Sequence, residues 1–308
     1  MNNFNLYELK NTNSKTSYSN YNKSEVKKKL NNCLKNKELD NSIYWTVELD
    51  MSGEQDYIWN LIIYFFCDYI NIGNSSFIIF LYKRYLSFNF YIKKIYTDKY
   101  DYRNSLKMRN HLSELISSAV LSNYNNITKL PTINSKNFEL QNHKLLCNRL
   151  DDINNVLLIN DPKDIIVPSN EILFILKNNN NSSNYKQNCL FWLNWLFTWD
   201  KKFNNNLIYR KIDNIDSKYH YSIHWVIWEI IFFSIKKKKN SNLNNKIKCL
   251  FYFFKLNYKK QTQKNKLITT AILIILDNKK YDDLEFYQEY HTTLQTIMNI
   301  NYVYNLVH

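Results

Sequence analysis

Apolar side chains recur at intervals of three and four residues along most of the chain beyond about residue 40. The clearest segments are 54–71, 77–96, 103–121, 190–199 and 219–235. This spacing places apolar groups on one face of a helix, and that face must be buried against other helices. The pattern therefore predicts an all-α protein. A further short helix is expected before Gly53, which can take the left-handed geometry that closes a helix, although its near-alternating apolar residues also fit a strand.

The helical segments form two groups that are separated by a polar stretch. Residues 41–123 are expected to make an N-terminal helical unit, and residues 168–308 a C-terminal helical unit. The irregular connection 124–167 contains Pro131 and Pro162, which break the periodicity. We expect two antiparallel helical units, arranged as a bundle or as an irregular α-solenoid.

Residues 1–40 are polar and rich in lysine, with few apolar groups. Such a segment buries too little surface to offset the entropy lost on ordering. We predict a disordered basic N-terminal arm that contains at most one short helix, near residues 24–39.

The net charge of the chain is +14, and its pI is about 9.3. A basic surface attracts nucleic acid, anionic membranes or acidic proteins. An alternative is that nucleotide bias inflates the lysine content, because Asn reaches 49 and other abundant residues also have A/T-rich codons, whereas Gly is 2 and Pro is 3. The basic residues are almost all Lys rather than Arg, the side chain that reads phosphate and guanine bidentately. Both interpretations stay open at this point.

Two lysine clusters lie at the ends of expected apolar helices, where they could neutralise phosphates. They consist of Lys236, Lys237, Lys238 and Lys239, and of Lys259, Lys260, Lys264 and Lys266. Both clusters are expected at the same end of the C-terminal unit. Trp199 follows Trp192 and Trp195 at helical spacing and precedes two lysines. This stripe is typical of a core, but an exposed Trp199 would stack bases.

Reaction-specific motifs are not found in the sequence. There is no CxxC pair, phosphate-binding glycine loop or nucleophile elbow. His220 and His224 have a spacing that suits a metal site, but the glutamate that would follow the first histidine of a metalloprotease helix is Tyr221. The paired carboxylates, such as Asp151-Asp152, are best explained as solvated loop groups. We therefore expect no enzyme, no cofactor and no metal.

The apolar runs are much shorter than the roughly 20 residues needed to cross a bilayer. The five cysteines are scattered and odd in number, which suits a reducing compartment. The N-terminus has no apolar signal core. These features predict a cytoplasmic protein without a membrane span.

Several packing motifs resemble a conserved, uncharacterised helical family of large nucleocytoplasmic DNA viruses. They are Tyr44-Trp-Thr-Val-Glu-Leu-x-x-Ser-Gly53 followed by Tyr57-Ile-Trp59, Arg109-Asn-His-Leu-x-Glu-Leu115, and the pairs Trp192/Trp195 and Trp225/Trp228. The resemblance covers residues 42–235, and it departs from the family in lacking a proline after Asn74. It implies a virus-encoded protein of the host cytoplasm or viral factory, and it transfers no catalytic residues.

Two functions follow as expectations. The first is a non-catalytic helical interaction or accessory protein with protein partners, linked to viral replication or transcription. The alternative is a module that binds DNA or RNA through the basic helix ends.

Overall fold

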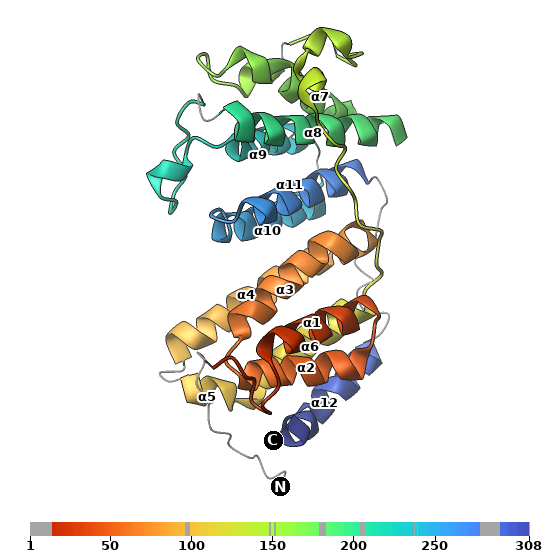
Figure 1. The fold of residues 1–308 in the computed structure, drawn as a ribbon, viewed down its shortest axis with the longest axis vertical. Coiled ribbons are helices and arrows are strands. Elements are labelled where there is room, and N and C mark those ends of the chain that lie inside the picture. Colours follow the sequence, from red (N-terminus) through yellow and green to blue (C-terminus); the bar gives the residue numbers. More distant parts are fainter. Residues whose placement is uncertain are drawn as a thin grey trace. The chain divides into compact units, whose positions relative to one another are not determined.

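The computed structural model describes residues 14–95, 99–147, 149–150, 152–178, 183–203, 207–236, 238, 240–277 and 290–307. Every regular element in these ranges is a helix, and none is a strand, which confirms the all-α prediction (Figure 1). The chain divides into two compact units. One combines Met1–Asn125 with Tyr281–His308, and the other is Asn126–Lys280.

The first unit begins with α1 (Lys23–Lys35) and α2 (Leu39–Met51), which pack together. Asn22 caps α1 by accepting a hydrogen bond from the Ser24 amide at 2.9 Å. The short helix predicted near residues 24–39 is confirmed by α1, whereas the disorder predicted for the arm 1–40 is wrong over its described part, residues 14–40; residues 1–13 lie outside the described residues. The physical reason is that four apolar side chains of α1 share one buried face, namely Val26, Leu30, Cys33 and Leu34.

Gly53 closes α2 as the sequence predicted. Its φ is 80°, a left-handed conformation that glycine adopts without strain. The next helix, α3 (Gln55–Phe65), continues into a π-helical turn at Phe66–Ile70 and a 3₁₀ turn at Asn71–Asn74. Gly73 lies in that second turn, where an added Cβ would meet the backbone oxygen of Asn123 at 2.5 Å. Both glycines are thus required by the local backbone.

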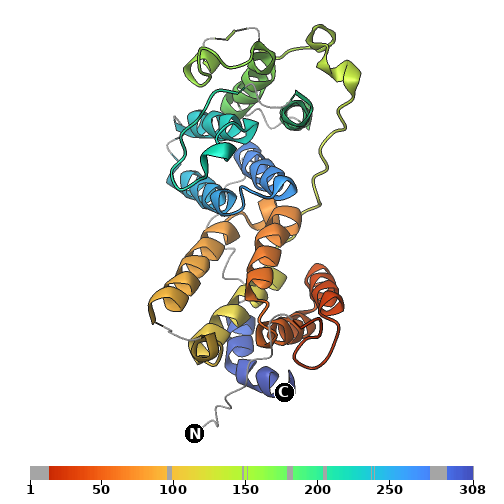
Figure 2. The ribbon, with the colours of Figure 1, turned by 60° about the vertical axis from the view of Figure 1, so that its left-hand side comes forward.

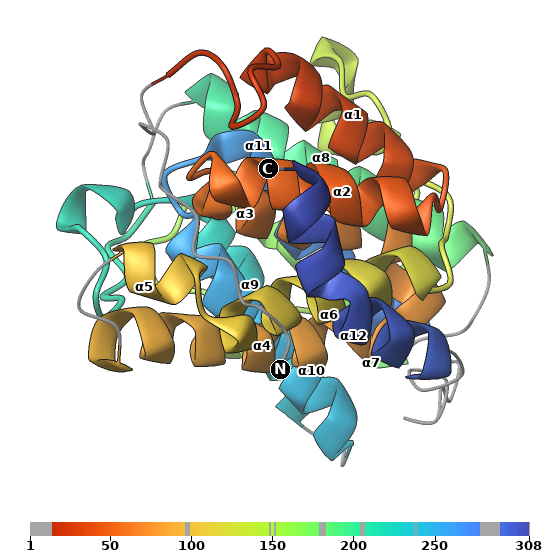
Figure 3. The same ribbon diagram turned by 90° about the horizontal axis from the view of Figure 1, so that it is seen from below.

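The rest of the first unit consists of α4 (Phe77–Phe90), the π-helical turn Tyr91–Ile95, α5 (Lys99–Arg103), α6 (Leu106–Leu121) and α12 (Tyr290–Val307). Helix α12 packs on α6 and α2 (Figure 3). The Tyr304 hydroxyl donates to Asp50 Oδ2 at 2.5 Å, and the Arg109 guanidinium carbon lies 4.1 Å from the Tyr304 ring centroid. The predicted C-terminal unit 168–308 is therefore wrong at its end, because the polar partners of α12 come from α2 and α6.

The second unit contains α7 (Ile166–Asn178), α8 (Ser183–Phe203), α9 (Ile223–Lys236), α10 (Ser241–Leu256) and α11 (Gln261–Leu276). Helices α10 and α11 lie side by side (Figure 2). Large rings fill the core, and Trp228 is 1% exposed with Phe251 and Phe254 at 5.1 and 5.5 Å between ring centroids. This packing explains how a chain so poor in alanine builds a dense interior.

The segment before α7 is irregular and carries four short 3₁₀ turns. These are Ser135–Phe138, Leu140–Asn142, Ile153–Asn155 and Lys163–Ile165. The buried Glu171 carboxylate of α7 accepts hydrogen bonds from the amides of Leu146 and Cys147, the latter at 2.8 Å. The segment is therefore held to the helices of the second unit by polar contacts that leave no periodic signal in the sequence.

Candidate nucleic-acid interface

The two predicted lysine clusters lie around two different turns and on the helix ends beside them. One turn joins α9 to α10, and the other joins α10 to α11. Helix α10 has 16 residues, so it separates the turns by about 24 Å at 1.5 Å per residue. The expectation that both clusters share one end of the unit is wrong, because consecutive turns of an antiparallel helical array fall at opposite ends.

Only two lysines of the first cluster lie among the described residues. Lys236 ends α9 and is exposed, while Lys238 is half-buried, and burial lowers its pKa. Lys237 and Lys239 lie outside the described residues. We therefore build the candidate surface from the second cluster.

The second cluster is mostly exposed. Lys259, Lys260 and Lys266 face solvent. Lys264 does not face solvent, because it is only 8% exposed. Burial lowers its pKa, and the nearby charge of Asp200 opposes this shift. Three of the four predicted lysines can therefore reach a phosphate, and the fourth is an internal group.

Tertiary structure adds further lysines to this turn from segments distant in sequence. The Ile223 amide at the start of α9 donates to Asp200 Oδ1 near the end of α8 at 3.3 Å, and the rings of Tyr219 and Tyr258 are 4.9 Å apart. These contacts bring together the end of α8, the loop 207–222, the end of α10 and the start of α11. We call this surface the basic end; its lysines are Lys201, Lys202, Lys211, Lys218, Lys255, Lys259, Lys260 and Lys266.

The acids of these segments offset little of that charge. Asp200 is largely enclosed, and burial raises its pKa. Asp216 is exposed and pairs with Lys218 at 3.4 Å between Nζ and Oδ2. The remaining acid of the loop is Asp213. The basic end therefore keeps an excess of positive charge.

Exposed aromatic rings lie among these lysines. Phe203, Tyr209 and Tyr221 are 46%, 42% and 43% exposed. The rings of Tyr209 and Tyr221 are 5.6 Å apart, and Lys202 Nζ lies 5.0 Å from the centroid of Phe203. Proteins that bind single-stranded nucleic acids combine a basic groove with rings on which bases stack.

Trp199 does not belong to this surface. It is 3% exposed, and its ring packs 6.2 Å from Phe203. The condition for base stacking at Trp199 is therefore not met, and this ring belongs to the core, as the helical spacing of the tryptophan stripe favoured. The exposed rings were missed in the sequence, although Phe203 directly follows Lys201-Lys202 and Tyr209 and Tyr221 bracket a polar loop.

A buried ion-pair network fixes the loop that carries Tyr209 and Tyr221. Arg210 donates through Nη1 and Nη2 to the two carboxylate oxygens of Asp161, at 3.1 and 2.5 Å, and through Nε to Glu229 at 2.7 Å. Burial alone would lower the pKa of Arg210, but these hydrogen bonds raise it. The backbone amide of Arg210 also donates to the His220 carbonyl at 3.2 Å. The loop is thereby held at both ends.

The two histidines do not form the metal-site geometry that their spacing allowed. His220 precedes α9, and its Nε2 pairs with the Ile215 carbonyl at 3.0 Å. His224 is fully buried, with Nε2 at 2.7 Å from the Asn265 side-chain oxygen and Nδ1 at 2.6 Å from the Ser222 hydroxyl. Within the described ranges, no three His, Cys, Asp or Glu residues gather as metal ligands.

The buried imidazole of His224 should make the protein sensitive to acid. Burial, reinforced by the Lys264 charge, lowers the pKa of His224 from 6.5 to about 3. Below pH 6.5 the His224 imidazole is therefore protonated in the unfolded chain but stays neutral in the folded chain. The free energy of unfolding falls as pH decreases for this reason. The slope is about 1.4 kcal/mol per pH unit, or roughly 2 kcal/mol at pH 5.

Urea denaturation at pH 7 and pH 5 measures this loss. Glutamine keeps hydrogen-bonding groups but takes no proton, so His224→Gln should remove this contribution and make the slope shallower. Part of the slope should remain, because burial also lowers the pKa of His111 to about 4. The exposed His291 gives the matched control, and His291→Gln should keep the wild-type slope. Equal slopes in wild type and His224→Gln would contradict the prediction.

The fold and this surface define an all-helical protein with a basic, aromatic-lined end on its second unit. No protein-family model, curated protein or solved structure matches the chain. None of the helices in the described ranges has the length and apolarity required to cross a bilayer.

Proposed function

We propose that the protein is a non-catalytic accessory protein that binds single-stranded nucleic acid through the basic end of its second unit. The observation that carries this proposal is the convergence of four chain segments on one surface of exposed lysines and exposed rings. Lysines supply charge neutralisation and counterion release, and the rings of Phe203, Tyr209 and Tyr221 supply stacking.

Binding through this surface should tolerate many sequences. Bidentate base recognition uses mainly arginine, and the one arginine in the loop, Arg210, is buried in its ion pairs with Asp161 and Glu229. Lysine acts as a point charge on the phosphate, and every base has a face that can stack. The chemistry therefore favours an unpaired strand over a particular duplex sequence.

The resemblance to the viral helical family suggests the process and the cellular location in which the proposed binding would take place. An accessory protein of replication or transcription meets unpaired strands, and the host cytoplasm or viral factory is the place that the resemblance implies. Protein partners expected of such an accessory protein are part of the same proposal.

Neutralising lysines of the basic end should weaken binding and reduce its salt dependence. The test variant is Lys202→Gln/Lys259→Gln/Lys260→Gln, and the control is Lys28→Gln/Lys93→Gln/Lys94→Gln, which removes the same charge from exposed positions of the first unit. Fluorescence anisotropy of a labelled oligothymidylate across a salt series measures both quantities. The slope of log affinity against log salt should fall by about 2 in the test variant, at 0.7 per phosphate contact.

The stacking contribution is tested separately. Tyr221→Ala should lower affinity by about fivefold or more, the lower end of what one base–ring stack contributes. Phe90→Ala removes a ring of the first unit that is 55% exposed, slightly more than Tyr221, and should leave affinity unchanged. Binding that ignores salt, or that weakens equally in the test and control lysine variants, would overturn the proposal.

A further inference from the structure

A groove opens in the second unit between the irregular segment that precedes α7 and the first turns of α8. Its volume is about 530 Å³, which is within the range of pockets that bind small molecules. His143, Lys144 and Leu146 form the wall on the irregular segment, and residues of α8 form the other wall. We call it the α8 groove. Asn184 in this wall lies about 25 Å along α8 from Lys201 of the basic end, at 1.5 Å per residue.

The wall on the irregular segment is held in place by contacts with α7 and α8. The Leu146 amide lies 3.0 Å from both carboxylate oxygens of Glu171 in α7. His143 Nε2 donates to the Asn137 carbonyl at 3.0 Å, and the His143 ring packs 5.1 Å from the ring of Phe191 in α8. The groove is therefore formed before a ligand arrives, which reduces the ordering cost of binding.

Three side-chain amides line the α8 wall. Asn184, Gln187 and Asn188 are separated by three and four residues along the helix, so the three amides lie on neighbouring positions of one face. Within the described ranges, no hydrogen bond occupies these side-chain amides. Each amide carries an acceptor next to two donors. The wall can therefore bind a ligand that offers a donor and an acceptor side by side.

Aromatic rings line the same groove. Tyr185 and Phe191 of α8 and His143 opposite them are half-buried, so part of each ring remains open. Trp192 is 3% exposed and packs 5.0 Å from Phe191 and 5.3 Å from His143. Proteins that recognise unpaired bases stack them on rings of this kind and bind the base edges by hydrogen bonds.

The charge of the α8 groove is positive. Lys144 is exposed, and none of the described residues that line the groove is acidic. A lysine acts as a point charge for a phosphate. The groove thus combines amides, rings and one cation, which are the groups that bind the edge, the face and the phosphate of a nucleotide.

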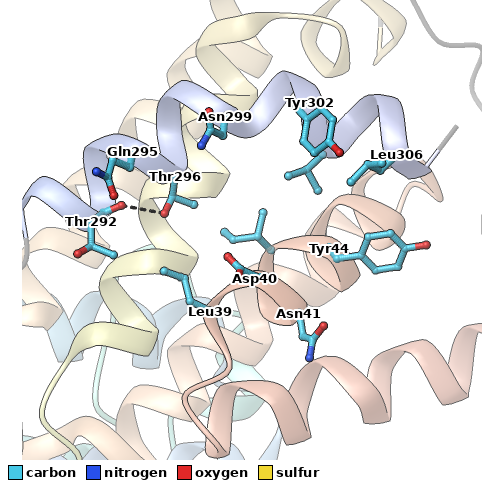
Figure 4. Close-up of a pocket in the computed structure, with 12 residues that line it drawn as sticks. Leu39, Asp40, Asn41, Tyr44, Thr292, Gln295, Thr296, Asn299, Tyr302 and Leu306 are labelled. Atoms are coloured by element: carbon cyan, nitrogen blue, oxygen red, sulfur yellow. Dashed lines mark hydrogen bonds between the residues drawn. The ribbon is translucent and has the colours of Figure 1, made fainter.

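A groove in the first unit, between α12 and α2, provides a comparison (Figure 4). Its volume is about 480 Å³, and it also carries two exposed amides, Gln295 and Asn299. Its charged group is the carboxylate of Asp40. A carboxylate repels a phosphate, so this groove does not fit a nucleotide and supplies control variants.

We infer that the α8 groove binds an adenine nucleotide. A side-chain amide pairs with two adjacent atoms of adenine, because it accepts from the N6 amino group and donates to N7. Guanine has acceptors at both positions and is bound there by arginine or lysine instead. Two sources supply this chemistry, namely a free adenine nucleotide and an unpaired adenosine in a strand. Only the second rests on the proposed function.

Isothermal titration calorimetry of the full chain with adenosine monophosphate (AMP) and guanosine monophosphate (GMP) tests the site. AMP should bind about fivefold or more tightly than GMP, the lower end of what one amide–base pair contributes. Asn184→Ala/Gln187→Ala should abolish this preference with unchanged circular dichroism, since alanine favours a helix. Gln295→Ala/Asn299→Ala removes two exposed amides from the groove of the first unit and should keep the preference.

Lys144→Gln tests the phosphate contact. AMP affinity should fall to that of adenosine, which has no phosphate, and adenosine affinity should stay the same. Lys136→Gln removes an exposed lysine that lies in the same irregular segment but outside the groove, and it should change neither affinity. The basic-end variant Lys202→Gln/Lys259→Gln/Lys260→Gln should bind AMP like the wild type, so a failure of the proposed function leaves this test intact.

Fluorescence anisotropy with labelled oligoadenylate and oligothymidylate separates the two sources. If the ligand is a strand, oligoadenylate should bind more tightly, and Asn184→Ala/Gln187→Ala should remove the difference. If the ligand is a free nucleotide, the two oligonucleotides should bind equally while AMP keeps its preference over GMP.

Three results contradict the inference. One is the absence of any adenine preference, both of AMP over GMP and of oligoadenylate over oligothymidylate. Another is a preference that survives Asn184→Ala/Gln187→Ala. The third is an equal loss in Gln295→Ala/Asn299→Ala, which would place the binding outside the α8 groove.

Discussion

Arg210→Met should lower the free energy of unfolding by roughly 3–5 kcal/mol, the usual cost of removing one partner from a buried ion pair. The side chain of Asp161 is 1% exposed and that of Arg210 is 4% exposed, so neither has water to replace the other. Methionine fills much of the volume of arginine but leaves the Asp161 carboxylate charged and without its main partner. Urea denaturation followed by circular dichroism measures the loss.

A second variant separates charge from packing. Arg210→Met/Asp161→Asn removes both charges, and it should recover a large part of the lost stability, since the cost lies in an uncompensated buried charge. Lys218→Met breaks the exposed pair with Asp216 and should change stability by less than about 1 kcal/mol. A loss below about 1 kcal/mol for Arg210→Met would show that the network is not a main stabilising element.

Trp195→Ala should also lower the free energy of unfolding by roughly 3–5 kcal/mol, as deletion of a buried aromatic side chain usually does. The side chain is 1% exposed, and its ring lies 5.0 Å from Phe138 and 6.5 Å from Trp192. Its Nε1 also donates to the Asn137 carbonyl at 2.8 Å. The indole therefore joins α8 to the irregular segment 134–143.

The matched variant is Trp195→Phe, which keeps a ring but loses the donor. It should cost less than the alanine variant and leave the Asn137 carbonyl without this partner. Hydrogen exchange should show faster exchange in the segment 134–143 in both variants, and faster still with alanine. If exchange rises uniformly over the second unit instead, Trp195 acts only as a core residue and does not hold this segment.

The basic end shows how far side-chain type alone predicts a surface. Lys259, Lys260 and Lys266 were recognised as a cluster because they are adjacent in sequence, and they are exposed as expected. Lys201 and Lys218 join them only through the packing of α8 and the loop 207–222, which no local pattern reveals. Lys264 is chemically identical to its neighbours, yet it is buried, because its position on α11 turns it toward Asp200.

Trp199 and α12 show the same limit for apolar groups. Helical periodicity predicts that the three tryptophans lie on a buried face, but it does not predict whether the last of them is exposed at the end of the helix. Trp199 is buried. The pattern of α12 likewise predicts a helix with a face to bury. Its partners, α2 and α6, lie far away in sequence and are selected by contacts such as Tyr304 with Asp50.

Local sequence patterns are enough to predict that this protein is helical, where most of its helices run and that Gly53 closes one of them. Those features depend on interactions within a few residues, such as helical periodicity and the conformational freedom of glycine. Long-range packing was needed to show that α1 packs on α2, that α12 belongs with the first unit and that lysines from four segments share one surface. These features depend on contacts between residues that are distant in sequence. An apolar helix face can pack against many other apolar faces, so its local pattern does not identify its partner.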